Sequence, residues 1–130
     1  MPAPSKAEKL VDAILSLNDK ILLVSIRGWS GNIVAVKSKG SFRERFFGVS
    51  GLIGTKYSGS LTVATLGLMN EVKDVFGETQ AVVTIYENCK VMLLPMPSYE
   101  LIVGLTLELS VVTEDFSLAH KIESILAEYL

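Results

Sequence analysis

The sequence predicts an α+β domain in which helices cover both faces of a five-stranded antiparallel sheet. Two observations support this prediction. Segments with helical period alternate with short β-rich runs, which gives the order α-β-β-α-β-β-β-α over residues 1–130. Apolar residues also occupy both alternating sets of positions in the last predicted strand, residues 100–109, so both of its sides are expected to be buried.

Length and composition agree with one domain spanning residues 1–130. The chain has 130 residues, of which 49% are hydrophobic and 20% are charged, which is enough apolar material for a core. The net charge of −2 argues against a nucleic-acid-binding protein, because neutralising phosphates needs a basic surface. No apolar run is long enough to span a bilayer, and the start MPAPSKAEKL lacks the apolar region of a secretory signal.

One cysteine and one histidine limit the chemistry that the chain can perform. An intrachain disulfide is impossible, which fits a cytoplasmic protein. A structural zinc site usually needs four nitrogen or sulfur ligands, so no metal and no other cofactor is expected. We interpret Cys89 as a turn residue and His120 as a solvated helix residue, because nothing in the sequence places an activating partner beside either one. No catalytic residue is predicted, and the chain is not expected to be an enzyme.

The first part of the chain predicts a helix followed by a hairpin. Ser5 is a good N-cap and Glu8 follows three residues later, as in a capping box. The runs KILLVSIR (20–27) and IVAV (33–36) are rich in β-formers. They flank the turn cluster GWSGN (28–32), so the three segments together predict a β-hairpin.

A second helix is predicted over residues 61–76, with Gly77 as the glycine that ends it. The side that is expected to face the core consists of Leu61, Ala64, Leu68, Val72 and Val75, and it is flanked by Met69 and Phe76. A weaker apolar stripe lies opposite and consists of Val63, Leu66, Gly67 and Asn70. A lone surface helix needs only one apolar face, so two stripes indicate that this helix is covered on two sides.

Three strands and a helix are predicted to close the chain. The strands are residues 80–86, 90–94 and 100–109. At Pro95 and Pro97 the second of them is expected either to end or to lie exposed, because proline cannot donate a hydrogen bond to the ladder. The Thr-Glu-Asp triplet at 113–115 offers caps for a last helix over residues 116–130.

This order, the hairpin KILLVSIR–GWSGN–IVAV and the closing block AVVTIYENCKVMLLPMPSYELIVGLTLELS together resemble the roadblock/dynein light-chain family and its profilin-like relatives. The resemblance covers nearly the whole chain and is closest to small archaeal members of unassigned function. It implies a single roadblock-like domain that is non-enzymatic, forms homodimers or heterodimers, and acts as a scaffold or regulator, often of small Ras-like GTPases. In the typical dimer of that family the middle helix packs against its mate and the third strands pair into one continuous sheet.

Six residues match the dimer contact that the resemblance implies. They are Val63, Leu66, Gly67, Asn70, Val82 and Thr84. Gly67 would let two backbones approach closely, because it has no side chain. The alternative is that Val63 and Leu66 contact the long connection over residues 38–60 of the same chain. That connection and the GWSGN turn, which stands where family members often have an Asp-Gly turn, are the two departures from the family pattern.

The long connection contains SFRERFFGVSGLIGTKYSGS, whose spaced glycines resemble a phosphate-binding loop. A Walker A loop needs its lysine directly after the last glycine, whereas here the order is Gly54-Thr55-Lys56, so nucleotide binding is not expected. Residues 37–56 contain five basic residues against Glu44, a net charge of +4 in a chain of net charge −2. Such a polarised charge can attract an acidic partner.

Six residues in and near this connection are candidates for contact with an anionic group or a protein partner. They are Trp29, Lys39, Arg43, Arg45, Phe46 and Lys56. An acidic protein surface or an anionic membrane surface would fit this combination of basic and aromatic residues, whereas nucleic acid is disfavoured by the overall charge. The alternative is that the phenylalanines pack onto the sheet, the charges are solvated, and Trp29 lies over the hairpin.

The sequence therefore favours a cytoplasmic, dimerising scaffold or regulator that works through protein contacts, with a small Ras-like GTPase as the partner class that the resemblance implies. A second hypothesis is a small-ligand sensor with a pocket between the sheet and the 38–60 connection. An enzyme of unknown class is the third hypothesis. Neither a particular partner nor a particular ligand is indicated by any motif.

Overall fold

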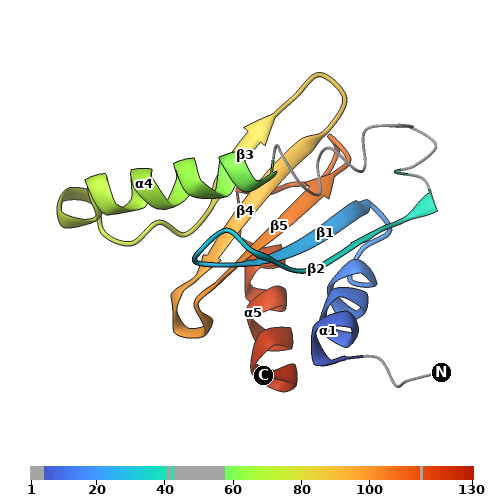
Figure 1. Cartoon of the computed structure of the whole chain (residues 1–130). Helices are drawn as coiled ribbons and strands as arrows, with labels where there is room; N and C mark the ends of the chain where they lie inside the picture. Colours follow the sequence, from blue (N-terminus) through green and yellow to red (C-terminus); the bar gives the residue numbers. More distant parts are fainter. Residues whose placement is uncertain (1–4, 41, 43–57, 115) are drawn as a thin grey trace.

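The computed structural model describes residues 5–40, 42, 58–114 and 116–130. Its elements, in chain order, are α1 (Lys6–Leu15), β1 (Ile21–Gly28), β2 (Ile33–Ser38), α4 (Ser58–Phe76), β3 (Val82–Ile85), β4 (Lys90–Met96), the 3₁₀ turn η2 (Pro97–Tyr99), β5 (Leu101–Leu107) and α5 (Ser117–Tyr129). This order confirms the predicted α-β-β-α-β-β-β-α arrangement (Figure 1).

The strands form one five-stranded sheet in the order β2-β1-β5-β4-β3, and every neighbouring pair is antiparallel. The predicted β1–β2 hairpin is present, with a change of register between Ile26 and Arg27. The last strand of the chain, β5, lies in the middle of the sheet between β1 and β4. The edges are formed by β2 and β3, so within the described residues these two strands each have one side without a neighbouring strand.

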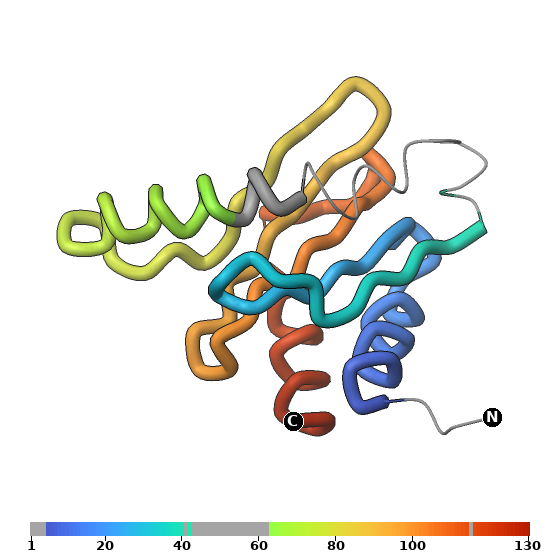
Figure 2. Tube along the Cα trace, in the orientation of Figure 1, coloured from blue at the N-terminus to red at the C-terminus, as the bar shows by residue number. Residues whose placement is uncertain are grey.

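Helices α1 and α5 lie side by side on one side of the sheet, and α4 lies on the other side (Figures 1 and 2). The main core fills the space between the sheet and helices α1 and α5. It includes Leu10, Ile14, Val24, Ile26, Leu94, Val103, Leu105, Ile122 and Leu126. A smaller cluster consists of Leu22, Leu23 and Phe42. None of the helices in the described part of the chain is both long and apolar enough to cross a lipid bilayer.

The helix ends agree only in part with the predicted caps. Ser5 caps α1 as expected, because its hydroxyl accepts a hydrogen bond of 3.2 Å from the Glu8 amide. The caps predicted for α5 at Thr113 and Glu114 are wrong, because the Glu114 carboxylate accepts a hydrogen bond from the Thr113 amide instead. Helix α5 begins after Phe116, which has left-handed backbone geometry (φ 57°) and makes no side-chain capping bond.

The prediction that β4 ends before Pro95 is also wrong. Strand β4 continues to Met96, and Pro95 pairs with Ile102 of β5. The neighbour on the other side, β3, is shorter, and its last partner on β4 in this direction is Leu93. Pro95 therefore has a neighbouring strand on one side only, which explains how an inner strand accommodates a residue without an amide hydrogen.

Replacing Ile122 by alanine is expected to destabilise the fold. Ile122 is fully buried in the main core, and deleting a buried aliphatic side chain costs about 2–5 kcal/mol of unfolding free energy. Urea denaturation at fixed protein concentration measures this change. Glu128→Ala, an exposed position on the same helix, is the matched control and should change the stability by less than about 0.5 kcal/mol. Equal effects of the two substitutions would contradict the described core.

Candidate functional site

Helix α4 has a large apolar surface that the rest of the described chain leaves uncovered. Val75 and Phe76 are 77% and 80% exposed, and Val63 and Leu68 are also exposed. We call these four residues, together with the exposed Gly67 and Asn70, the α4 outer surface. Exposed apolar patches of this kind mark interaction sites on folded proteins, so this surface is the first candidate for the functional site.

The buried side of α4 differs from the predicted core-facing stripe. Thr65 and Met69 are its buried residues, and Val72 is half-buried. The prediction for Ala64, Leu68 and Val75 is wrong, because all three are exposed, while the Leu61 side chain lies outside the described residues. For Leu68 and Val75 the physical reason is visible in Figure 1, where the C-terminal half of α4 extends past the sheet and no other described element lies against it.

The predicted dimer residues on α4 meet the conditions for a contact with a second molecule, except for one. Val63, Gly67 and Asn70 are exposed, whereas Leu66 is half-buried. A Cβ atom built on Gly67 would have no other atom within 4 Å. The surface around Gly67 is therefore open, and a second backbone can approach it without a clash inside this chain.

Strand β3 adds an open edge to this region of the molecule. It is an edge strand, and the predicted contact residues Val82 and Thr84 on it are half-buried. Ile85, which is 65% exposed, and Tyr86, which is also exposed, belong to the segment 80–86 that the resemblance implies for the dimer contact. An unpaired strand edge with exposed apolar side chains can pair with a strand of another molecule.

The β1–β2 turn that displays Trp29 is held in place by Arg27. The Arg27 side chain is only 3% exposed, and its Nη1 donates a hydrogen bond of 2.6 Å to the Gly31 carbonyl. Burial lowers the pKa of the Arg27 guanidinium from its ordinary value. Trp29 is half-buried, and a Cβ atom on Gly31 would lie 3.9 Å from Val63 Cγ2. The turn therefore borders the α4 outer surface.

Of the six residues predicted to contact an anionic group or a protein partner, the structure describes Trp29 and Lys39. Lys39 is half-buried, and its Nζ donates a hydrogen bond of 2.7 Å to the Asn18 carbonyl, so this lysine fastens the chain near the α1–β1 turn. Arg43, Arg45, Phe46 and Lys56 lie outside the described residues, as does most of the 38–60 connection that would cover the predicted ligand pocket.

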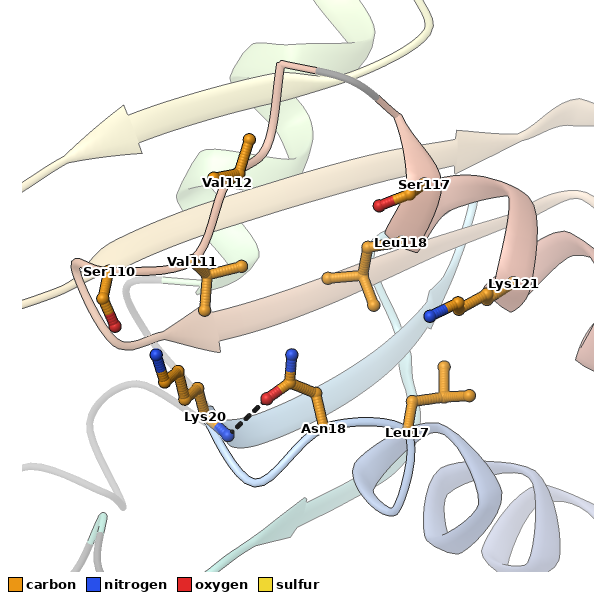
Figure 3. Close-up of a pocket in the computed structure, with 9 residues that line it drawn as sticks. All are labelled: Leu17, Asn18, Lys20, Ser110, Val111, Val112, Ser117, Leu118 and Lys121. Carbon is orange, nitrogen blue, oxygen red and sulfur yellow. Dashed lines mark hydrogen bonds between the residues drawn. The ribbon is translucent and has the colours of Figure 1, made fainter.

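A cavity of about 280 Å³ lies where the α1–β1 turn meets the start of α5 (Figure 3). Leu17, Val111 and Leu118 give it an apolar lining, and Lys20 and Lys121 lie at opposite sides of it. The amide of Lys20 donates a hydrogen bond of 2.8 Å to Asn18 Oδ1. Because the two ammonium groups lie apart, they do not converge on a single small anion.

Among the residues that the structure describes, no three His, Cys, Asp or Glu side chains come together in a geometry that could hold a metal ion. Cys89 is buried at the β3–β4 turn, and His120 is exposed on α5. The described features that suit a function are thus surfaces for contact with other molecules.

Solved structures share this fold at low sequence identity. MglB from Myxococcus xanthus is 12% identical, with a TM-score of 0.70, over 98% of this chain and 91% of that chain. A Roadblock/LC7 domain from Streptomyces avermitilis is 9% identical, with a TM-score of 0.60, over 92% and 94%. LokiProfilin1, solved in complex with rabbit actin, is 14% identical, with a TM-score of 0.55, over 98% and 96%. These similarities confirm the predicted roadblock-type, profilin-like fold.

Comparison with protein-family models gives no match, and neither does comparison with curated protein sequences.

Replacing Arg27 by methionine is expected to loosen the turn that displays Trp29. The substitution removes the donor to the partly buried Gly31 carbonyl, and leaving a buried group unsatisfied costs about 1–3 kcal/mol. Urea denaturation followed by the fluorescence of the chain's one tryptophan measures both the stability and the turn. The control is Lys37→Met on β2, whose ion pair with Asp12 is exposed and is worth about 0–1 kcal/mol. A smaller effect for Arg27→Met than for Lys37→Met would contradict this role.

Proposed function

We propose that this chain, with its roadblock-type, profilin-like fold, is a non-enzymatic scaffold or regulator that works as a homodimer in the cytoplasm. Residues 1–130 would act as a single domain. The observation that supports the proposal most strongly is the combination of the apolar α4 outer surface with the open edge of β3. Both features lack a partner within the described chain, and both suit contact with a second copy.

Burial of the α4 outer surface would supply the energy of association. Removing apolar surface from water stabilises by roughly 25 cal/mol per Å², and the exposed Val63, which lies on the same side of α4 as Gly67, would contribute to it. In a two-fold symmetric dimer each patch meets the same patch of the other copy. Gly67 would then lie where the two α4 helices approach most closely, because it has no side chain to hold them apart.

Pairing of the two β3 edges would complete the same interface. Each β3 strand would donate and accept backbone hydrogen bonds with its counterpart, so that the two sheets become continuous. This pairing would also cover Ile85, which is exposed in the single chain. The arrangement is the one that the resemblance to the roadblock family implies, and the described exposures of α4 and β3 support it.

The partner class that fits this proposal is a small Ras-like GTPase, as the resemblance implies. The half-buried Trp29 beside the α4 outer surface is a suitable contact residue, because tryptophan is enriched among the residues that dominate interface energies. The basic residues Arg43, Arg45 and Lys56 would add attraction to an acidic partner surface.

Replacing Gly67 by glutamine is expected to disrupt the dimer while leaving the monomer folded. The new side chain has open space within its own chain but would clash with a closely packed second helix. Overpacking typically costs about 1–3 kcal/mol, so the dimer dissociation constant should rise by roughly tenfold or more. Light scattering over a range of micromolar concentrations measures this shift. Circular dichroism should show no loss of helix, because glutamine favours helices more than glycine does.

The matched control for Gly67→Gln is Lys73→Gln, which places the same side chain at an exposed position of α4 on a different side of the helix. It should leave the dimer constant unchanged. A wild-type chain that stays monomeric at tens of micromolar would overturn the proposed dimer, and a Gly67→Gln dimer as tight as the wild type would remove Gly67 from the interface.

Binding to small Ras-like GTPases is expected to depend on the bound nucleotide. The immobilised chain should retain a GTPase of its host in one nucleotide state, since a regulator must distinguish the two states to act on the switch. Capture with purified GTPases loaded with GDP or with a non-hydrolysable GTP analogue measures this difference. Retention that ignores the nucleotide, or no retention in either state, would contradict the GTPase part of the proposal and leave the dimer untouched.

A further inference from the structure

A second cavity, of about 370 Å³, lies on the opposite flank of α5 from the cavity in Figure 3. Three segments that are far apart in the sequence surround it. They are residues 78–80 before β3, residues 95–99 at the end of β4 and in η2, and the start of α5 from Phe116 to Glu123. None of the six residues assigned to the dimer contact lines this cavity, so it is a separate site.

The charged residues that line this cavity are acidic. Glu78 comes from the segment before β3 and Glu123 from the second turn of α5, and no lysine or arginine is present in the lining. Neither carboxylate has a hydrogen bond or ion pair with another residue in the part of the chain that the structure describes. Two unpaired carboxylates from different elements at one cavity favour a cationic occupant.

The apolar part of the lining is aromatic and proline-rich. Its aromatic lining residues are Tyr99 and Phe116, and Pro97 belongs to η2 together with Tyr99. Tyr99 is half-buried, and Phe116 is 42% exposed. Aromatic faces attract cations, and a planar guanidinium stacks on them more readily than an ammonium group does.

The backbone is strained on both sides of this cavity. Among the described residues, Phe116 and Glu100 are those with positive φ that are not glycine, at 57° and 53°. Phe116 begins α5, and Glu100 directly follows the η2 residues that line the cavity. Left-handed geometry is costly for an aromatic residue, and such outliers in folded proteins gather at functional sites. The first position before α5 would suit asparagine or serine better for stability alone.

We infer that this cavity binds the arginine side chain of a protein partner. The guanidinium would lie against Tyr99 and Phe116 and would donate hydrogen bonds to Glu78 and Glu123. Arginine fits better than lysine, because its planar group can stack on a ring and bind two carboxylates at once. The inference rests on the cavity alone and does not depend on the proposed dimer or on a GTPase partner.

The probe for this site is the capped tripeptide acetyl-Gly-Arg-Gly-amide, titrated into the full ¹⁵N-labelled chain. As the peptide is added, the amide resonances of Tyr99, Ala119, His120 and Glu123 should shift and should reach saturation at millimolar peptide. The shifts should weaken as the salt concentration is raised. The matched control replaces arginine by citrulline, which keeps the shape and loses the charge. A lysine peptide is the second control and should bind more weakly than the arginine peptide.

Two variants separate the charge contribution from the ring contribution. Glu78→Gln combined with Glu123→Gln removes both carboxylates and should weaken arginine binding by about tenfold or more. Phe116→Asn should weaken binding by roughly threefold because it removes one ring. The same substitution should raise the melting temperature, because asparagine tolerates left-handed geometry and caps helices. A gain in stability together with a loss of binding is a result that a purely structural Phe116 would not give.

Four outcomes would overturn the inference. The first three are an absence of shifts around this cavity, equal binding of the citrulline peptide, and unchanged binding by the double glutamine variant. Tighter binding of the lysine peptide would replace arginine by a simple ammonium group as the occupant and would also contradict the proposed recognition. Light scattering on the same variants shows whether the dimer is intact, so failure here is distinguishable from failure of the proposed dimer.

Discussion

The central position of β5, with both of its sides buried, is the constraint on which the rest of the structure depends. Ile102 to Leu107 are all buried, and buried backbone groups must find hydrogen-bond partners, which β1 and β4 provide. The fit is close at Gly104, where a Cβ atom would lie 2.5 Å from Ser25 Oγ. A strand buried on both sides requires cover on both faces of the sheet, and α1 and α5 give this cover on one face.

Helices α1 and α5 are buried more extensively than α4, and this difference leaves surfaces available for contact. Helices α1 and α5 pack against the sheet through a continuous core, whereas α4 buries only a narrow side, represented by Thr65 and Met69. The exposed part of α4 includes the apolar side chains Val63, Leu68, Val75 and Phe76, some of which we propose to contact a second copy. The start of α5, in contrast, borders a cavity that combines carboxylates with aromatic rings. The molecule therefore offers an apolar contact and a charged contact in different places.

The element order, the hairpin and the antiparallel sheet could be predicted because local apolar periodicity reflects which faces are buried. The side of α4 that faces the sheet could not be predicted, because apolar residues lie on several sides of this helix. The continuation of β4 through Pro95 could not be predicted either. It depends on where the neighbouring strand β3 ends, and the pairing of two strands is not visible in the local sequence. The cavity beside α5 also left no local signal, because Glu78, Tyr99 and Phe116 are far apart in the sequence and meet only in the folded chain.

The sheet order also has a consequence for how the chain folds during synthesis. Residue 21 at the start of β1 pairs with residue 107 at the end of β5, so the centre of the sheet cannot close until almost the whole chain has left the ribosome. Until then the β1–β2 hairpin has one side of β1 unpaired, and that strand is rich in apolar residues. Contacts between such distant segments slow folding and expose strands to aggregation. The late arrival of β5 makes the nascent chain dependent on rapid closure or on chaperones.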